Sequence, residues 1–571
     1  MWQSEQIEVL IVGAGPTGLA LAYQLRRLGV SFRIIEKNPT PSTTSKAIGL
    51  QYRVSEVLAW MGLFERFRAR SVMGAGINFN LNGEPILHLQ LDRLQGMSGR
   101  GAFEPQSVML PQSATEGLLI DALHERGVAV EYSTAFVAFT QDGERIVSRI
   151  QHAGGAEELV ESQYLVSCEG AHSLIRKQAG IAFVGRTYPL AYYMADVEVD
   201  WQLNRNEVYV WLHEDGMFSA IPMPGERRWR LFVESSAQVD ERPTEVTLDL
   251  IRQLMAERID DHTTQLSAPT WLTEFRISCR MVDRFRSGRA FLAGDAAHIH
   301  SPTGGQGITT GIQDAYNLTW KLGMVLRGAA PDTLLDTYDE ERQVAVQRVL
   351  ASTDQTSNIM LAHSRAAQLF RDRVVLPLLR SRAMQKRITR RLSQLDFNYR
   401  GLSLSAQQEA GLFGRARVRA GNRTPDVLFR DARTGEQTSL FAHLGRSRLF
   451  ALLGPGAGER PAEVARLREA LGRLGIDCLL VLPETAQPPH GSDGLIDISG
   501  DFQRLYGARG EFLYLIRPDG YVGLFQRPID ERALRAYMAR LFATDVVERA
   551  FAAEARPSSA VVPAGRAAGE R

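Results

Sequence analysis

The sequence predicts a mixed α/β fold, in which a parallel-sheet domain is interrupted by an antiparallel sheet and followed by a separate C-terminal domain. Three observations support this prediction. At three places a short apolar strand runs into a glycine-rich turn and then a helix, which is typical of parallel α/β units. A stretch of alternating strands with few glycine turns fills residues 181–279. Strands and helices alternate again after Pro425.

Composition and charge exclude several classes of protein. The chain has 571 residues, 44% hydrophobic and 23% charged, which is typical of a globular protein of roughly three or four domains. Its formal net charge of +1 indicates neither a nucleic acid nor a membrane as partner. No apolar stretch approaches the ~18 residues of a membrane span, and no leader-like segment precedes the first strand. Cys168, Cys279 and Cys478 form no CxxC pair, so we expect no disulfide framework, no metal site and a reducing, cytoplasmic location.

The first forty residues contain the clearest motif. A strand at residues 7–12 runs into Gly13-Ala14-Gly15-Pro16-Thr17-Gly18, a helix at 19–28 and a second strand at 31–35. This is the dinucleotide-binding fingerprint, in which the glycines allow a tight turn, close approach of a pyrophosphate and close helix packing. The helix N-terminus offers free N–H groups to the phosphates. Glu36 follows the second strand, where an acid accepts hydrogen bonds from a ribose and repels a 2′-phosphate.

The next elements carry weaker signals. Lys46 and Arg53 follow a polar loop at 38–45 and either meet a pyrophosphate or are solvated charges. Gln112 precedes an apolar helix at 118–123 and is either a cofactor contact or a surface residue. Further patterns predict a helix at 52–60, a hairpin at 77–89 around Asn82-Gly83, a strand at 128–131, and hairpin arms at 147–150 and 158–160.

Two more strands deliver glycine turns to helix N-termini. A buried strand at 164–168 ends in Glu169-Gly170-Ala171-His172-Ser173, before a helix that ends at Gly180. A strand at 289–293 runs into Gly294-Asp295, and a helix at 308–326 begins after Pro302-Thr303-Gly304-Gly305-Gln306-Gly307. Such turns suit phosphates and ribose hydroxyls. Three of them in one chain indicate a shared ligand.

Residues 181–279 are predicted to form an antiparallel sheet. Strands are expected at 192–199, 208–211, 218–222, 229–233 and 274–278, with a helix at 246–257. Aromatic residues in these strands, such as Trp211 and Phe218, either line a pocket or form sheet core, and alternation allows only about half of them to face one side. His213 lies in the same sheet and is either a base or a structural histidine.

The remaining chain is helical and then mixed. Residues 331–392 are predicted to be helical with a basic end, which indicates either an acidic partner or a solvated helix face. After Pro425, strands at 447–453, 478–482, 512–516 and 522–525 and a helix at 463–474 form a separate domain. The tail from Glu554 is predicted to be disordered.

Together, these motifs resemble the single-component flavin-dependent aromatic hydroxylases, and among them the phenol hydroxylase-like and the polyketide and rifampicin-type enzymes. The resemblance covers roughly residues 5–400 and includes the three glycine turns in order. It implies a discontinuous FAD-binding domain of Rossmann type at 1–180 and 280–400, interleaved with a substrate-binding sheet at 181–279 together with 76–103. It also implies a thioredoxin-like domain without CxxC at 401–550, followed by the disordered tail 554–571.

The resemblance also implies which residues bind the cofactor. The expected FAD contacts are Gly13, Ala14, Gly15, Pro16, Thr17, Gly18, Glu36, Lys37, Lys46, Gln112, Glu169, Gly294, Asp295, Pro302, Gly304, Gly305, Gln306, Gly307, Ile308 and Thr309. Asp295 is expected on the ribityl chain. Three of these positions depart from the family pattern, because Glu169 replaces an aspartate, Lys46 replaces an arginine and Thr309 replaces an asparagine.

The activity that the resemblance implies is monooxygenation. NADPH or NADH reduces FAD, O₂ adds to form a flavin C4a-hydroperoxide, and a phenolic or polyketide aromatic substrate is hydroxylated. Trp211, Phe218 and Pro302 are candidate substrate contacts, and His213 is the candidate base. Baeyer–Villiger or epoxidising oxygen insertion, a flavin dehydrogenase or oxidase, and a non-catalytic flavin-binding regulator are the alternatives. A monomer or homodimer is expected, with the small aromatic substrate and O₂ as partners.

Overall fold

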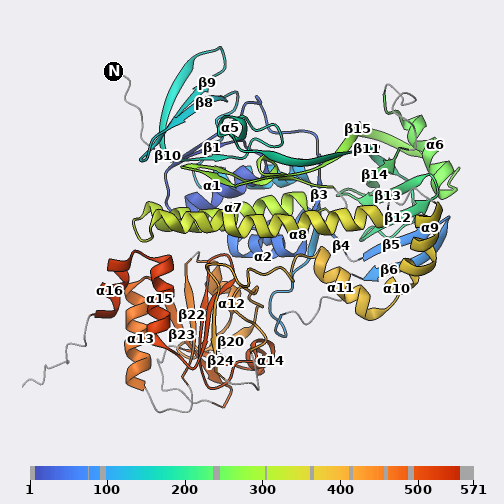
Figure 1. The fold of residues 1–571 in the computed structure, drawn as a ribbon. Helices are drawn as coiled ribbons and strands as arrows, with labels where there is room; N and C mark the ends of the chain where they lie inside the picture. The colour runs from blue at the N-terminus through green and yellow to red at the C-terminus, as the bar shows by residue number, and fades with distance from the viewer. Residues whose placement is uncertain are drawn as a thin grey trace, which may run out of the picture.

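The computed structural model of the chain describes residues 7–74, 76–90, 98–235, 245–301, 305–360, 365–410, 416–446, 448–455, 461–485 and 494–552. Figure 1 shows the N-terminal parallel sheet, a second sheet beside it and the C-terminal domain below both, with the long helices α7 (Gly307–Leu326) and α8 (Asp336–Met360) crossing the middle. In this part of the chain, none of the helices combines the length and apolarity that crossing a membrane requires.

The first sheet is mainly parallel and has the order β16-β17-β10-β1-β2, with β8 and β9 joined at β10. Val12 pairs with Ile35 on one side and Ser167 on the other, and Ser167 pairs with Leu292. The carboxyl ends of four parallel strands therefore lie at one edge, where ligands bind in such sheets. The strands are β1 (Ile7–Val12), β2 (Phe32–Ile35), β8 (Ala135–Gln141), β9 (Ile146–Gln151), β10 (Glu157–Ser167), β16 (Arg286–Ser287) and β17 (Ala290–Leu292).

Helices α4 (Gln112–His124) and α7 each pack against α1 (Pro16–Arg27) beside this sheet, and the short α5 (Leu174–Gln178) follows β10. A small sheet of the order β3-β7-β4 and helices α2 and α3 lie nearby. Their bounds are β3 (Ile48–Leu50), β4 (Val72–Gly74), β7 (Ser107–Pro111), α2 (Tyr52–Met61) and α3 (Phe64–Ala69).

The second sheet has eight strands in the order β18-β15-β11-β14-β13-β12-β5-β6. They are β5 (Gly76–Leu81), β6 (Glu84–Gln90), β11 (Phe183–Val199), β12 (Glu207–His213), β13 (Gly216–Pro222), β14 (Arg228–Glu234), β15 (Leu266–Val282) and β18 (His298–Ile299). Helix α6 (Leu248–Ile259) packs on one face. The prediction of a purely antiparallel sheet is wrong at one place, because β5 and β12 run parallel.

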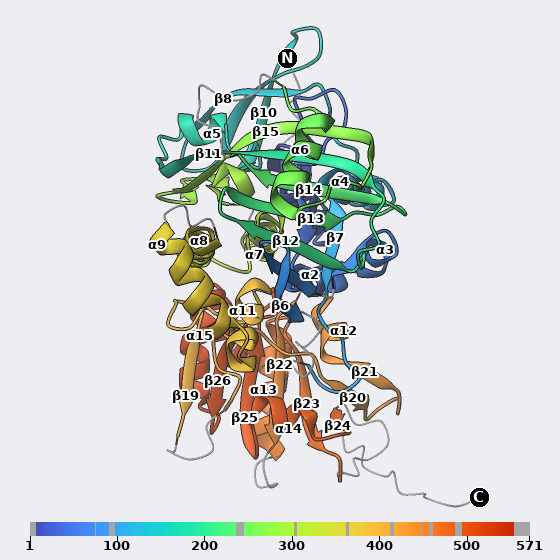
Figure 2. The ribbon, with the colours of Figure 1, turned by 90° about the vertical axis from the view of Figure 1, so that its right-hand side faces the viewer.

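A helical connection leads from the first domain to the last. After α7 come a 3-10 turn at Asp332–Leu335, α8, α9 (Arg365–Phe370), a π-helical turn at Arg371–Val375, α10 (Leu376–Leu379) and α11 (Arg382–Leu392). Figure 1 shows α9 at the right-hand margin of the molecule beside β12 and β5, with α10 and α11 below β5 and β6, and Figure 2 shows α11 next to β6. The predicted helical and basic character of this segment is confirmed.

The C-terminal domain is built on an eight-stranded sheet of the order β19-β26-β25-β22-β23-β24-β20-β21. β22 and β23 run parallel, whereas β22–β25 and β25–β26 are antiparallel. The bounds are β19 (Ala406–Glu409), β20 (Leu428–Asp431), β21 (Gln437–Ser439), β22 (Phe450–Pro455), β23 (Asp477–Pro483), β24 (Leu495–Asp497), β25 (Glu511–Ile516) and β26 (Val522–Arg527), with α12 (Leu440–Leu444), α13 (Pro461–Arg473), α14 (Asp501–Tyr506), α15 (Glu531–Leu541) and α16 (Thr544–Ala552). The thioredoxin-like assignment stays a prediction, and residues 554–571 lie outside the described residues.

Buried charges join this domain to the first. Glu341 of α8 accepts a hydrogen bond from Lys321 of α7 at 2.8 Å and pairs with Arg517 of the C-terminal domain. Glu56 of α2 pairs with Arg53 at 2.5 Å and with Arg423 of the C-terminal domain. Because removing one member of a buried ion pair is costly, these contacts fix the two domains against each other.

Most predicted elements are confirmed, and three are corrected. Residues 128–131 form no strand, because only an isolated bridge joins Glu131 to Ile35. The two strands predicted at 158–160 and 164–168 are one continuous strand, β10. Helix α4 begins at Gln112 rather than Leu118. The prediction placed its start too late because the first residues of the helix are polar and show no apolar periodicity.

Candidate functional site

The first glycine turn has the geometry that each of its glycines was predicted to supply. Gly13 has φ +104°, and a Cβ there would lie 2.3 Å from the carbonyl oxygen of Cys168. A Cβ at Gly18 would lie 2.0 Å from the Gly13 oxygen. A Cβ at Gly15, by contrast, would meet nothing within 4 Å, and no side chain caps the helix that begins there. The N-terminus of α1 therefore faces open space, as a pyrophosphate site requires.

Glu36 lies against this turn. Its carboxylate accepts hydrogen bonds from the backbone N–H of Ala14 at 3.0 Å and of Asn38 at 3.0 Å. Strands β1 and β2 are parallel neighbours, and Gly13 and Glu36 follow their carboxyl ends. The acid therefore lies beside the first turn, as the fingerprint requires.

In the second turn, the side chain of Glu169 caps the helix that follows it. The Glu169 carboxylate accepts hydrogen bonds from the Ser173 hydroxyl at 2.7 Å and from the Ile175 N–H at 3.1 Å, both at the start of α5. Buried Arg176 then donates to the Ala171 oxygen at 2.8 Å and the Ala296 oxygen at 2.9 Å. Arg176 thus ties the second turn to the third, and a cofactor contact by the Glu169 side chain stays a prediction.

The third turn is held by Asp314 of α7. Its buried carboxylate accepts hydrogen bonds from the Gly294 N–H at 2.9 Å, the His298 ring at 2.7 Å and Arg342 of α8 at 2.6 Å. Burial alone would raise the pKa of Asp314, but the charges of Arg342 and His298 bring it below its ordinary value. The ionised Asp314 therefore fixes the turn that carries Asp295.

Thr17 joins the first turn to the third. A Cβ at Gly294 would lie 2.5 Å from the Thr17 hydroxyl oxygen, and one at Gly311 of α7 would lie 2.3 Å from it. Only glycine leaves room for Thr17 at these two positions. Together with the Gly13–Cys168 approach, this contact brings all three predicted turns to one place.

Asp295 projects from this meeting point. Its side chain is exposed, yet surrounding protein at longer range raises the pKa of its carboxyl through loss of solvent. This combination is expected of a group inside a concave site.

The start of α7 is tied to α2. The Thr309 hydroxyl accepts a hydrogen bond from the Gln51 N–H at 2.9 Å, and a Cβ at Gly305 would lie 3.4 Å from the Gln51 amide. Gln306 is buried and accepts from the Gln394 amide at 2.8 Å. No side chain caps α7, so its N-terminal N–H groups remain available to a ligand.

The other predicted cofactor contacts vary in position. Lys37 and Lys46 are exposed, Gly307 and Ile308 begin α7, and the Gln112 amide donates to Glu116 at 2.8 Å. Pro302 and Gly304 lie outside the described residues. In the part of the chain that the structure describes, no cluster of histidine, cysteine or acidic side chains could hold a metal ion.

The second sheet has two unlike faces. The outer face packs against α6, and it carries Trp211 and Phe218 in one apolar cluster with Ile251 and Met255. The inner face carries Tyr192, Phe232 and Phe275, whose ring centroids lie 5.0–6.0 Å apart. Figure 1 shows α6 on the far side of this sheet from α7.

The inner face contacts the loop that follows Glu36. Arg230 pairs with Asp196 on the neighbouring strand at 2.7 and 2.8 Å, and both are buried. The same guanidinium donates to the Ser45 carbonyl at 2.6 Å, in the loop that follows Glu36. Trp211 and Phe218 lie on the opposite face under α6, so this position does not support them as substrate contacts, and that assignment stays a prediction.

His213 also lies on the outer face. Its Nδ1 accepts a hydrogen bond from the Asp215 N–H at 3.2 Å and lies 3.3 Å from Arg258 of α6. Burial, and then the charge of Arg258, lower the pKa of the His213 ring. The prediction of His213 as the substrate base has no support from this position.

Sequence reasoning missed the residues that position the site. Asp314, Arg342, Arg176 and Arg230 act through partners that are distant in the chain, and nothing in their local sequence identifies those partners. Asp314 carries the clearest local signal, because it is a charged residue inside the mainly apolar helix α7 and therefore requires a buried partner.

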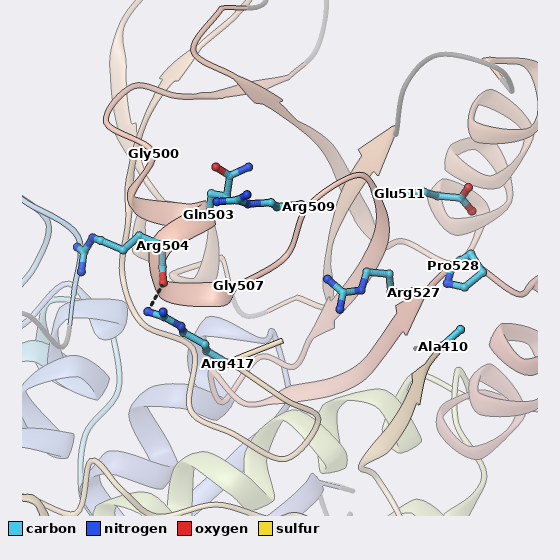
Figure 3. A pocket seen from close by; sticks show the side chains of 10 residues that line it. All are labelled: Ala410, Arg417, Gly500, Gln503, Arg504, Gly507, Arg509, Glu511, Arg527 and Pro528. Atoms are coloured by element: carbon cyan, nitrogen blue, oxygen red, sulfur yellow. Dashed lines mark hydrogen bonds between the residues drawn. The ribbon is translucent and has the colours of Figure 1, made fainter. Parts of the chain in front are cut away.

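Two cavities differ in their relation to the three turns. One of about 370 Å³ lies between α7, α8 and residues 391–398, and Gln306 of the third turn is part of its lining. Figure 3 shows the other, of about 970 Å³, in the C-terminal domain, where Arg504 pairs with Asp501 and Arg417 donates to the Arg504 carbonyl. None of the residues that line this second cavity belongs to the three turns.

Comparisons with known proteins identify the family of the chain. Residues 6–353 match the family described as FAD binding domain. The chain is 33% identical to a flavin-dependent monooxygenase of Mycobacteroides abscessus over 93% of this chain and 99% of the relative. It is 30% identical to pentachlorophenol 4-monooxygenase of Sphingobium chlorophenolicum, over 94% and 98%.

Solved structures agree as well. An anhydrotetracycline hydroxylase from Streptomyces rimosus superposes with a TM-score of 0.74 at 28% identity, over 94% of this chain and 99% of that one. A ternary complex of aklavinone-11 hydroxylase with FAD and aklavinone superposes with a TM-score of 0.76 at 26% identity, over 97% and 100%.

Proposed function

The chain belongs to the FAD-binding family of flavin-dependent aromatic monooxygenases, and from this premise we propose that it hydroxylates a phenol or a polycyclic aromatic polyketide. It is an FAD-dependent enzyme that acts on an aromatic compound, with NADPH or NADH as the electron donor typical of the family. The single observation that carries the proposal is the meeting of three glycine turns beside a sheet face lined with aromatic side chains.

The residues at this meeting point fit FAD. We propose that its pyrophosphate lies over Gly15, that Glu36 accepts hydrogen bonds from its ribose and that Asp295 contacts its ribityl chain. The open space at Gly15 and the uncapped start of α1 support the first contact. The uncapped start of α7 would direct its positive end toward negative charge on the ring system. When bound, FAD supplies the redox chemistry that activates O₂.

We propose the inner face as the wall of the substrate site. Phe232 and Phe275 are half-buried and offer flat apolar surface on which an aromatic ring can stack, and the fully buried Tyr192 packs against both of them. Pentachlorophenol 4-monooxygenase and aklavinone-11 hydroxylase, which resemble the chain over most of its length, are named for aromatic compounds of different size. An apolar wall of this kind also helps to exclude water from the reacting ring.

One group on the inner face can exchange a proton near neutral pH. Glu234 is buried and lies opposite Tyr192 in the strand register, with its carboxylate accepting from the Met217 N–H at 3.2 Å. Burial raises the pKa of this carboxyl to about 7. We therefore propose Glu234, rather than His213, as the titrating group of the substrate face.

The test is turnover of the purified, FAD-loaded chain under ¹⁸O₂. NADH and NADPH oxidation would be followed with a panel of phenols and aromatic polyketides, and peroxide would be measured in parallel. We expect a substrate that stimulates oxidation, forms little peroxide and gains one ¹⁸O atom on its ring. A product without ¹⁸O would indicate a dehydrogenase or oxidase, and ¹⁸O in a ring-expanded lactone or an epoxide would indicate the other oxygen insertions.

A further inference from the structure

One surface segment exposes an unusual amount of apolar side chain. Within ten residues, Leu369 is 54% exposed, Phe370 60%, Val374 41% and Leu378 57%. The other strongly exposed large apolar side chains among the described residues, Leu159, Leu174 and Val184, lie in three different elements. Single exposed residues are normal, but a cluster indicates a contact surface.

The same segment concentrates positive charge. Residues 365–391 contain eight exposed cations, which are Arg365, Arg373, Arg380, Arg382, Lys386, Arg387, Arg390 and Arg391. Among the described residues, none of these eight forms an ion pair, and the segment's one acid, Asp372, pairs with the buried Arg371 at 2.7 Å. The net charge of the whole chain is only +1, so this local excess is balanced elsewhere.

The segment packs against the second sheet, so its exposed side has a defined position on the protein surface. Buried Leu376 and its neighbour Leu379 pack against Leu212 and Met217 of the second sheet. The opposite side of the same helices presents Phe370, Val374 and Leu378 to solvent, at four-residue spacing. Figure 1 shows the segment at the margin of the molecule.

We propose that residues 365–391 dock on the surface of an anionic lipid bilayer. Helices with basic and apolar side chains lie in the plane of such a surface, because the apolar residues enter the acyl boundary and the cations attract anionic headgroups. A second copy of the chain is a less favourable partner, because a symmetric dimer through this segment would place the eight cations of one copy against the eight of the other. A nucleic acid would leave the apolar cluster in water.

This inference goes beyond the proposed function and does not depend on it. It revises the expectation of no membrane partner, which rested on the net charge of the whole chain. Because the segment packs on the second sheet, docking would hold that sheet close to the bilayer surface.

The experiment is co-sedimentation of the FAD-loaded full chain with vesicles of phosphatidylcholine, with and without phosphatidylglycerol. We expect binding only to the vesicles that contain phosphatidylglycerol, and release at high salt. The variants Phe370→Ser/Leu378→Ser and Arg387→Gln/Arg390→Gln should each weaken this binding about tenfold or more. The matched control Leu159→Ser/Val184→Ser, which removes equally exposed apolar side chains elsewhere, should bind as the parent does.

Three outcomes would overturn the proposal. The first is absence of binding to phosphatidylglycerol vesicles by a parent protein that retains its flavin. The second is equal weakening by the control variant. The third is a dimer in light scattering that Phe370→Ser/Leu378→Ser dissociates, since this would assign the surface to a second copy. Flavin content and thermal unfolding of each variant would show that it is folded.

Discussion

The outer and inner faces of the second sheet come from the same strands but have opposite character. The outer face is closed by α6 and consists of apolar and aromatic side chains such as Trp211, Phe218 and Trp229. The inner face carries a buried ion pair, Arg230–Asp196, a buried carboxyl at Glu234 and the aromatic cluster around Tyr192. The inner face also contacts the cofactor loops through Ser45.

This difference indicates which face of such a sheet contributes to the active site. Aromatic residues are present on both faces and do not distinguish them. Buried charges do, because a charge is retained in the interior only where a partner or a function requires it. We therefore expect substitutions on the outer face to change mainly stability, and substitutions on the inner face to change cofactor or substrate binding as well.

The largest effect is expected for Arg230→Met. It leaves Asp196 buried without its partner and breaks the contact to Ser45, so we expect a loss of about 3–5 kcal/mol in the free energy of unfolding and weaker FAD binding. The control Arg230→Met/Asp196→Leu removes both charges and should regain most of the stability without regaining FAD affinity. Denaturant unfolding measures the stability and FAD titration measures the affinity. If Arg230→Met bound FAD as tightly as the parent does, this would contradict a link between Arg230 and the cofactor through Ser45.

A matched pair of phenylalanines gives the next effect. Phe218→Ala on the outer face should cost about 3–5 kcal/mol of stability, because Phe218 is fully buried, and should leave KM for the aromatic substrate unchanged. Phe232→Ala on the inner face should cost less stability, since Phe232 is half-buried, but should raise KM. The opposite pattern in steady-state kinetics would place the substrate on the outer face.

The raised pKa of Glu234 leads us to expect that stability depends on pH. Its pKa is about 7 in the folded state against an ordinary 4.5, so the folded protein keeps a proton that the unfolded chain releases. The stabilisation is complete below about pH 4.5 and is lost as the pH rises toward 7, by about 3 kcal/mol at most. Unfolding of Glu234→Gln should show a flatter profile over this range, whereas Glu226→Gln in an exposed turn should keep the parent's profile.

The smallest effect is expected for His213→Asn. Since His213 is on the outer face, stability should change by no more than about 0.5 kcal/mol, and the pH profile of kcat/KM should keep both of its limbs. Loss of one limb would restore His213 as the base and would contradict the division between the faces.

The sequence predicts well those features that depend on neighbouring residues. The glycine turns and the hairpin at Asn82-Gly83 follow from local backbone requirements, and the structure has them where expected. The three turns could be predicted to meet, because parallel strands bring their carboxyl ends to one edge.

The rest depends on contacts between distant residues. Alternation shows which residues of one strand share a face, but it does not show that Trp211 and Phe218 of paired strands lie on the face that α6 covers. The parallel pairing of β5 with β12 joins strands that are about 130 residues apart, as the partners Asn80 and Trp211 illustrate. The bond between Asp314 and Gly294 likewise depends on how α7 packs, which no local pattern encodes.

The central claim, that FAD lies over the first glycine turn where the three turns meet, is tested most directly at Gly15. A Cβ at Gly15 meets nothing in the protein itself, so Gly15→Val should leave the thermal unfolding of the FAD-free chain nearly unchanged. We expect this variant to lose at least about a hundredfold in FAD affinity, because the side chain would occupy the space of the pyrophosphate. An FAD dissociation constant equal to that of the parent, measured by titration of the FAD-free protein, would contradict the account.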